Sequence, residues 1–361
     1  GVTAAITPKP LTLSGTSIAN KVYDSTTAAT ITNTGVISGM IAGDVVTLDT
    51  GAATASFASA DVAYQAGAVT SQAVTVSGMA LSGVAAANYS VAQPVGLTAT
   101  ITPKPLSLSG VVVTAAKVYD ATLGATVTNS GSLTAGAANA TDGRYYAGDA
   151  IGLSGNTTAR YNDVNVATAN LIAFDLSGVT LTGAAAKVGN YSLSSVAAVA
   201  GSITPKTLSM SGLPTSTLIK VYDGTTVVSV SGSPVLAVAE AVGTGTAGDG
   251  KSYVGDSVAI IGSAVGTYNS ANVASANLIS FDIGGISLSS TVAGKTGNYV
   301  LTPVASVAGS ITPKALTMSG LSVASSKVYD GTTDAVVSGT ASLANAVAAG
   351  TGSSIDGKAY L

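Results

Sequence analysis

The sequence contains no cysteine, histidine or tryptophan, and only 9% of its 361 residues are charged. Without histidine and cysteine, serine–histidine catalysis, cysteine nucleophiles and ordinary zinc sites are excluded. No GxGxxG or GxxxxGK motif stands between a strand and a helix, as nucleotide-binding loops require. The lack of cysteine fits a cytosolic protein and equally fits bacterial surface repeats. We therefore expect no enzyme and no cofactor.

Strong charge and long apolar runs are also missing. The 14 basic and 17 acidic residues leave a net charge of −3, and no basic patch is visible. So small a charge steers no partner, and nucleic acid binding is not expected. Serine, threonine, glycine or aspartate interrupts every apolar stretch within a few positions, so we expect no membrane insertion. Glycine, alanine, serine, threonine and valine dominate instead, which suits strands.

The dominant feature is a repeat. The string ITPK begins at Ile6, Ile101, Ile203 and Ile311, a spacing that fits whole small domains. We predict repeats at residues 1–100, 101–202 and 203–310, with a partial fourth at 311–361. Because residue 361 falls inside a repeat, we expect the parent protein to continue beyond it.

The pattern within one repeat favours β-structure. In the second copy Pro103 and Pro105 favour an extended linker, after which Leu106 and Leu108 alternate with serines. Further alternating runs and turn signals follow every 8–12 residues, as in β-sandwiches. Only Ala237–Val242 looks helical. The sequence predicts an all-β fold, with tandem antiparallel, immunoglobulin-like β-sandwich domains in an extended array. The alternative is a β-grasp-like repeat domain.

Each copy carries the string KVYD. A tyrosine recurring at a fixed strand position usually buries its ring and bonds its hydroxyl to the backbone, and aspartate caps turns. An exposed tyrosine beside lysine would instead suit sugar binding, which we regard as the weaker interpretation. The structural residues predicted in this way are Tyr23, Asp24, Tyr119, Asp120, Tyr222, Asp223, Tyr329 and Asp330.

A connection of variable length precedes the recurring Gly-Asp step. Asp142 and Asp149 flank it in the second copy, and Asp249 and Asp256 flank it in the third. Calcium takes oxygen ligands, so these four are its candidates, but turn capping is the favoured interpretation because no DxDxD spacing occurs. A covalent Lys–Asn crosslink would need a buried carboxylic acid beside the pair, and we do not favour it.

Together these strings resemble a known family. KVYDGTT, a Gly-Asp step, a run such as VTVSGMALSG, then AANYS and ITPK resemble the YDG-type repeat domains of large bacterial surface adhesins, including filamentous-haemagglutinin-like exoproteins. The first two copies have Ser25 and Ala121 where Gly224 and Gly331 stand, which puts a turn with positive φ in doubt there. The resemblance implies a secreted or surface-anchored protein and no catalytic residue.

Two functions are consistent with these observations. In the first, the chain is the structural repeat region, or stalk, of an extracellular adhesin that projects a binding region in cell adhesion or biofilm. Host or surface glycans or proteins would then bind outside this chain. In the second, it is the material of an extracellular filament or sheath, which low charge favours because weakly charged surfaces pack side by side. In either case the expected partners are neighbouring repeats or copies of the chain.

Overall fold

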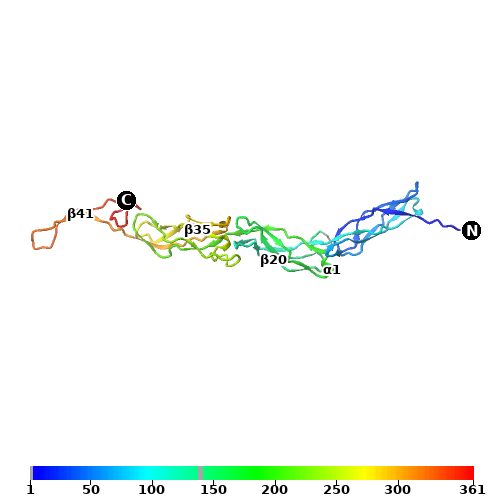
Figure 1. Ribbon diagram of the computed structural model, residues 1–361, viewed down its shortest axis with the longest axis horizontal. Helices are drawn as coiled ribbons and strands as arrows, with labels where there is room; N and C mark the ends of the chain where they lie inside the picture. Colours follow the sequence, from blue (N-terminus) through cyan, green and yellow to red (C-terminus); the bar gives the residue numbers. More distant parts are fainter. Residues whose placement is uncertain (1–2, 137–140) are drawn as a thin grey trace. The chain divides into compact units, whose positions relative to one another are not determined.

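The computed structural model describes residues 3–136 and 141–361, which form short β-strands in many small sheets (Figure 1). The prediction of an all-β fold is confirmed. Among the described residues, the helical segments are one turn long: α1 (Ala185–Val188) and the 3₁₀ turns η1 (Ala86–Asn88), η2 (Ala147–Asp149), η3 (Val254–Asp256) and η4 (Thr296–Asn298). The helix-like stretch Ala237–Val242 is not helical; Glu240 there forms a β-bridge to Tyr253.

The first two copies contain most of the strands. The first repeat holds β1 (Lys9–Ser14), β2 (Ser17–Ile18), β3 (Lys21–Val22), β4 (Ala28–Ala29), β5 (Ile31–Asn33), β6 (Val36–Ser38), β7 (Thr47–Asp49), β8 (Thr54–Phe57), β9 (Tyr64–Gln65), β10 (Ala68–Val69), β11 (Gln72–Ser77), β12 (Ala80–Ser82), β13 (Tyr89–Val91) and β14 (Thr98–Ala99). The second holds β15 (Ile101–Thr102), β16 (Lys104–Leu106), β17 (Ser109–Val113), β18 (Ala116–Val118), β19 (Gly124–Ala125), β20 (Val127–Ser132), β21 (Ala135–Gly136), β22 (Tyr145–Tyr146), β23 (Gly152–Ser154), β24 (Thr158–Tyr161), β25 (Leu171–Asp175), β26 (Thr180–Thr182), β27 (Tyr191–Leu193) and β28 (Val199–Ala200).

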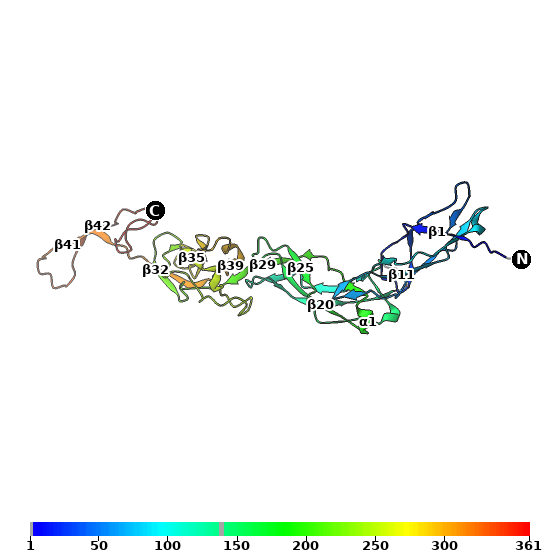
Figure 2. The same cartoon turned by 45° about the vertical axis from the view of Figure 1, so that its right-hand side comes forward.

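The later strands complete the series. They are β29 (Ser202–Thr204), β30 (Lys206–Leu208), β31 (Met210–Ser211), β32 (Leu218–Val221), β33 (Val227–Val228), β34 (Val235–Leu236), β35 (Val258–Gly262), β36 (Val265–Tyr268), β37 (Leu278–Asp282), β38 (Ile286–Ser290), β39 (Tyr299–Leu301), β40 (Val307–Thr312), β41 (Met318–Val323) and β42 (Val337–Leu343). Figure 2 shows β41 and β42 as the antiparallel hairpin of the fourth copy.

Buried and exposed residues alternate along the strands that form the core of each complete repeat. In the second copy β24 and β25 pair antiparallel within the four-stranded sheet β19-β24-β25-β28. Every second residue of β24 is buried, so Ala159 and Tyr161 face inward while their neighbours face water. The same four-strand arrangement, β4-β8-β11-β14, serves the first copy. The period-two pattern read from the sequence also holds at Leu106, which is fully buried while Ser107 is exposed.

The ITPK segment is not a linker, contrary to the prediction. Its first half, as in β15, pairs in parallel with the KVYD strand β3, and its second half, as in β16, pairs in parallel with β27. Pro105 is tolerated because β16 pairs on one side alone, so no ladder bond needs its missing N–H. The same two pairings recur around Ile203, so the sheets are mixed and not purely antiparallel.

Contacts divide the chain into two compact units. One comprises Gly1–Ala115, Gly124–Asn162 and Leu171–Gly201, and the other Ala116–Leu123, Asp163–Asn170 and Ser202–Leu361. Two segments of the second repeat, 116–123 and 163–170, thus pack with the third repeat. Consecutive repeats exchange contacts through such segments. In the described part of the chain, no helix has the length and apolar character to cross a membrane.

Candidate functional site

The KVYD motif forms the same turn in all four copies. Asp24 Oδ1 accepts hydrogen bonds from Lys21 Nζ at 2.7 Å and from the Thr26 backbone N–H at 2.9 Å. The residue after the aspartate has positive φ in every copy: 62° at Ser25, 58° at Ala121, 77° at Gly224 and 78° at Gly331. The turn therefore persists where glycine is missing, and the doubt raised by the first two copies is resolved. Ser25 and Ala121 adopt this left-handed backbone conformation although each has a Cβ, which makes the conformation strained.

This turn delivers a tyrosine into the body of the next repeat. Tyr23 is fully buried, and its ring meets Tyr146 and Tyr191 edge-on, with centroids 5.7 and 5.4 Å away. Tyr119 is equally buried and meets Tyr253 and Tyr299 in the same way. Such edge-to-face packing is the favoured geometry for aromatic rings. The joints that Tyr23 and Tyr119 build therefore each have a three-tyrosine core.

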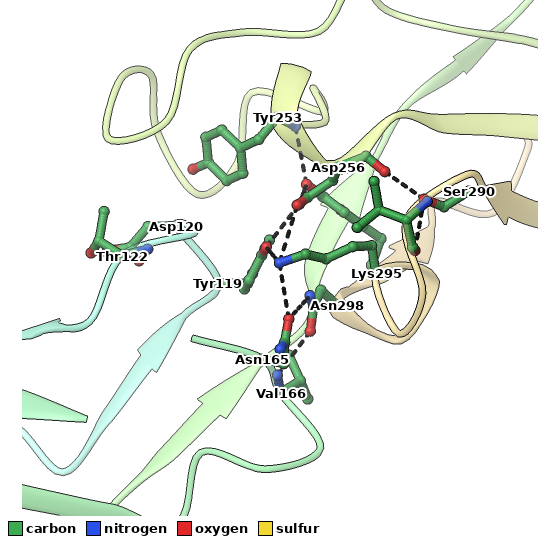
Figure 3. A network of polar contacts seen from close by, with 12 residues as sticks. Tyr119, Asp120, Thr122, Asn165, Val166, Tyr253, Asp256, Ser290, Lys295 and Asn298 are labelled. Atoms are coloured by element: carbon green, nitrogen blue, oxygen red, sulfur yellow. Dashed lines mark hydrogen bonds and ion pairs between the residues drawn. The ribbon is translucent and has the colours of Figure 1, made fainter. Parts of the chain in front are cut away.

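The tyrosine hydroxyls converge on one aspartate. Oδ2 of Asp149 accepts hydrogen bonds from Tyr23 at 2.8 Å and from Tyr191 at 2.6 Å. Asp256 accepts the equivalent bonds from Tyr119 and Tyr299, as Figure 3 shows for Tyr119. We expected a backbone acceptor. A buried carboxylate takes that place because the 3₁₀ turn of the Gly-Asp step aims it at the incoming tyrosine.

The aspartate of each joint also lies close to a lysine. Lys295 Nζ lies 3.3 Å from Asp256 Oδ1, and Lys187 lies 3.9 Å from Asp149. Burial, together with the hydrogen bond to the aspartate, raises the pKa of Tyr119 and Tyr299 well above the usual range. These tyrosines therefore stay neutral donors, as a joint built on hydrogen bonds requires.

An asparagine completes each joint. Asn298 Oδ1 accepts the backbone N–H of Val166 at 2.8 Å, and its Nδ2 donates to Asn165 Oδ1 at 2.9 Å (Figure 3). Asn190 makes the equivalent pair of bonds, to the Val62 N–H and to Asp61 Oδ1. Both asparagines are buried. The Lys-x-x-Asn-Tyr string thus holds a loop of the preceding repeat, through the amide and the backbone.

The variable connection is attached by the lysine of ITPK. Lys104 Nζ lies 2.6 Å from Asp142 Oδ1 and 4.4 Å from the centroid of the Tyr146 ring. Lys206 takes the same position over Tyr253 in the third copy, where it pairs with Asp249 at 3.0 Å. The underlying string is Asp-Gly-x-x-Tyr, which recurs at Asp142, Asp249 and Asp356.

The four calcium candidates therefore all have protein partners. Asp142 and Asp249 pair with lysines and also cap turns, accepting the N–H of Arg144 and of Lys251. Asp149 and Asp256 accept tyrosine hydroxyls. Within residues 3–136 and 141–361 there is no group of three or more acidic side chains that could hold a metal ion.

The remaining motif residues are placed differently. Tyr222 is half-buried and packs edge-on against Tyr360, with centroids 5.8 Å apart. Tyr329 is 93% exposed, although we expected it to be buried. Asp24, Asp120, Asp223 and Asp330 all pair with the lysine three residues before them.

The sequence analysis did not find the acceptors of the tyrosine hydroxyls. The Gly-Asp step recurs, and so does an Asn-Tyr pair at Asn88, Asn190 and Asn298, but neither was connected with the KVYD tyrosine. The signal was that all three recur together in each complete copy. The lysine of ITPK was likewise recognised without its partner, although Asp-Gly-x-x-Tyr was visible three times.

Comparison with known proteins identifies the repeat. No curated protein and no solved structure matches the chain. The YDG domain matches it three times, at residues 7–96, 102–198 and 204–306, which together are most of its length. The tyrosine of the motif builds the joints described above, and its aspartate caps the turn that carries it. The chain therefore belongs to the YDG domain family.

Proposed function

We propose that this chain is a structural repeat region, a stalk, of a bacterial extracellular adhesin, and that it projects or tethers a binding region in cell adhesion or biofilm. The observation that carries the proposal is the joint, which appears in the same form in two places. Tyr23 with Asp149 and Tyr119 with Asp256 each link one repeat to the next. A stalk needs such a joint at every step, whereas a catalytic or binding domain does not.

The contacts within the joint support a mechanical role. The tyrosine hydroxyls donate to Asp149, and the Asn190 amide bonds the Val62 N–H and Asp61, so few polar groups are left to bind a ligand. Buried polar networks of this kind fix one geometry, since partial satisfaction is costly. Pulling two repeats apart would expose Tyr23 and leave Asp149 without that donor. Separation is therefore opposed by burial and by hydrogen bonding together.

The low charge and the exposed apolar residues favour a second candidate, the material of an extracellular filament or sheath. Val36, Ile219 and Val254 are each more than 60% exposed. Apolar side chains on a weakly charged surface promote side-by-side packing. In this version copies of the chain are the main partners. Both candidates place the protein outside the cell.

Scattering and imaging test the two candidates. The proposed stalk should have a radius of gyration well above the roughly 20 Å of a compact chain of this length. A value near that figure would contradict both candidates. Electron microscopy of the native material separates them, because a stalk gives isolated thin threads and a sheath gives regular fibres of many chains.

A further inference from the structure

One lysine of the chain is held against two carboxylates at once. Lys206 is fully buried, with Nζ 2.5 Å from Glu240 Oε1 and 3.0 Å from Asp249 Oδ1. The side chains of Glu240 and Asp249 are only 10% and 19% exposed. The ring of Tyr253 covers the amine, with its centroid 4.4 Å from Nζ. An amine and two acids are thus confined in a site largely shielded from water.

The second and fourth copies have the pair but not the second acid. Lys104 faces Asp142, and Lys314 faces Asp356 at 2.9 Å. Glu240 lies opposite Tyr253 in a parallel bridge, where the other copies have Gly136 opposite Tyr146 and Val347 opposite Tyr360. Glu240 is also the sole glutamate of the whole sequence. The third repeat therefore has a feature that the shared fold does not require.

We propose that Lys206 and Asp249 join spontaneously in a covalent amide, an isopeptide crosslink, with Glu240 as the proton-transfer group. In this reaction the neutral Nζ attacks the Cγ of the protonated Asp249, and a C–N bond forms. Glu240 takes a proton from the nitrogen and passes it to the departing hydroxyl. One water molecule leaves, and nothing is oxidised or reduced.

The backbone around Asp249 selects it as the acyl partner. Its Oδ2 accepts the N–H of Thr246 at 2.9 Å and its Oδ1 accepts the N–H of Lys251 at 3.0 Å. Donors in those positions stabilise the oxyanion that forms when the carbonyl carbon is attacked. The described residues place no comparable backbone N–H on Glu240. That carboxylate, the nearer of the two to Nζ, is left free to carry protons.

The close packing of Lys206, Asp249 and Glu240 favours formation of the amide. Groups held at contact distance react as if at very high concentration, and a buried ion pair is costly to keep. Proton exchange within the pair gives the neutral amine and acid that condensation needs, and the amide removes both charges from the interior. Gly245 brings its backbone close over Glu240 and Asp249, where any side chain would collide with them. The loop therefore closes tightly over the reacting groups.

Mass spectrometry of the intact, denatured chain tests the proposal. The protein should be lighter than its sequence by one water molecule. Trypsin should then fail to cut after Lys206 and should yield a branched product that joins residues 188–220 to residues 221–251. A mass equal to that of the sequence, with normal cleavage after Lys206, would overturn the crosslink.

The Asp249-Gly250 sequence requires one more distinction, because a succinimide at Asp-Gly also loses water. That product would be the linear peptide 221–251, with Lys206 cleaved, and would likewise refute the proposal. Glu240→Gln keeps the size of the side chain and should leave the mass at the sequence value. Persistence of the branched peptide in Glu240→Gln would show that Glu240 has no part. The pairs at Lys104 and Lys314 are internal controls and should stay uncrosslinked. The inference does not rest on the proposed stalk function.

Discussion

The hydroxyl of Tyr119 donates a 2.8 Å hydrogen bond to Asp256, which lies 137 residues further along the chain. Tyr23 and Asp149 form the same bond across 126 residues. The acceptor in each case belongs to the next repeat, so the tyrosine of the motif acts between repeats, whereas its aspartate holds the turn within one. A substitution that removes one hydroxyl group can therefore test the joint.

Removing one hydroxyl should weaken the joint measurably. Tyr119→Phe keeps the buried ring but leaves Asp256 with one donor fewer, and we expect a loss of about 1–2 kcal/mol in the free energy of unfolding. Tyr119→Ala also removes the ring from a closed core and should cost about 3–5 kcal/mol. Chemical denaturation measures both. Tyr329→Ala is the matched control, since that ring is exposed; an equal loss there would contradict the joint.

The sequence predicts the strands better than their partners. The alternation of leucine and serine places Leu106 in the core, because one face of the strand packs inward and the other meets water. The pairing of Tyr119 with Asp256 depends on a chain path that brings distant segments together, and no local pattern encodes that path. Pro105 misled the linker prediction because proline forbids a central strand but not an edge strand.

The two joint asparagines offer a matched test of charge. Asn190 donates to the carboxylate of Asp61, whereas Asn298 donates to the neutral amide of Asn165. Asn190→Asp removes the donor and sets two carboxylates face to face, so we expect a loss of about 3 kcal/mol. Asn298→Asp should cost about 1 kcal/mol, because its partner carries no charge. Equal losses in thermal or chemical unfolding would show that these contacts do not decide stability.

The strained turns should accept glycine with a gain. Ala121 has a φ of 58°, which costs a residue with a Cβ about 1–2 kcal/mol. Ala121→Gly should therefore stabilise the chain by about 1 kcal/mol after the greater freedom of unfolded glycine is subtracted. Gly331→Ala is the reverse experiment, at a site with open space around the added methyl, and should cost a similar amount. A gain from both substitutions, or a loss from both, would show that φ does not set the outcome.

Alkaline pH should open the joint before it affects the rest of the strand framework. Burial and the hydrogen bond to Asp149 raise the pKa of Tyr23 and Tyr191 far above the usual value. A group whose folded pKa is raised contributes stability that is complete below its unfolded pKa and is lost as pH rises towards the folded one. The free energy of unfolding should thus be level up to about pH 10, the ordinary tyrosine value, and fall steeply above it. Tyr23→Phe removes one of the two titrating hydroxyls bonded to Asp149, so its decline should be shallower than that of the native chain. Parallel curves for the two proteins, measured by denaturation across the alkaline range, would mean that Tyr23 ionises as freely in the folded chain as in the unfolded one, which a hydroxyl buried against Asp149 cannot do.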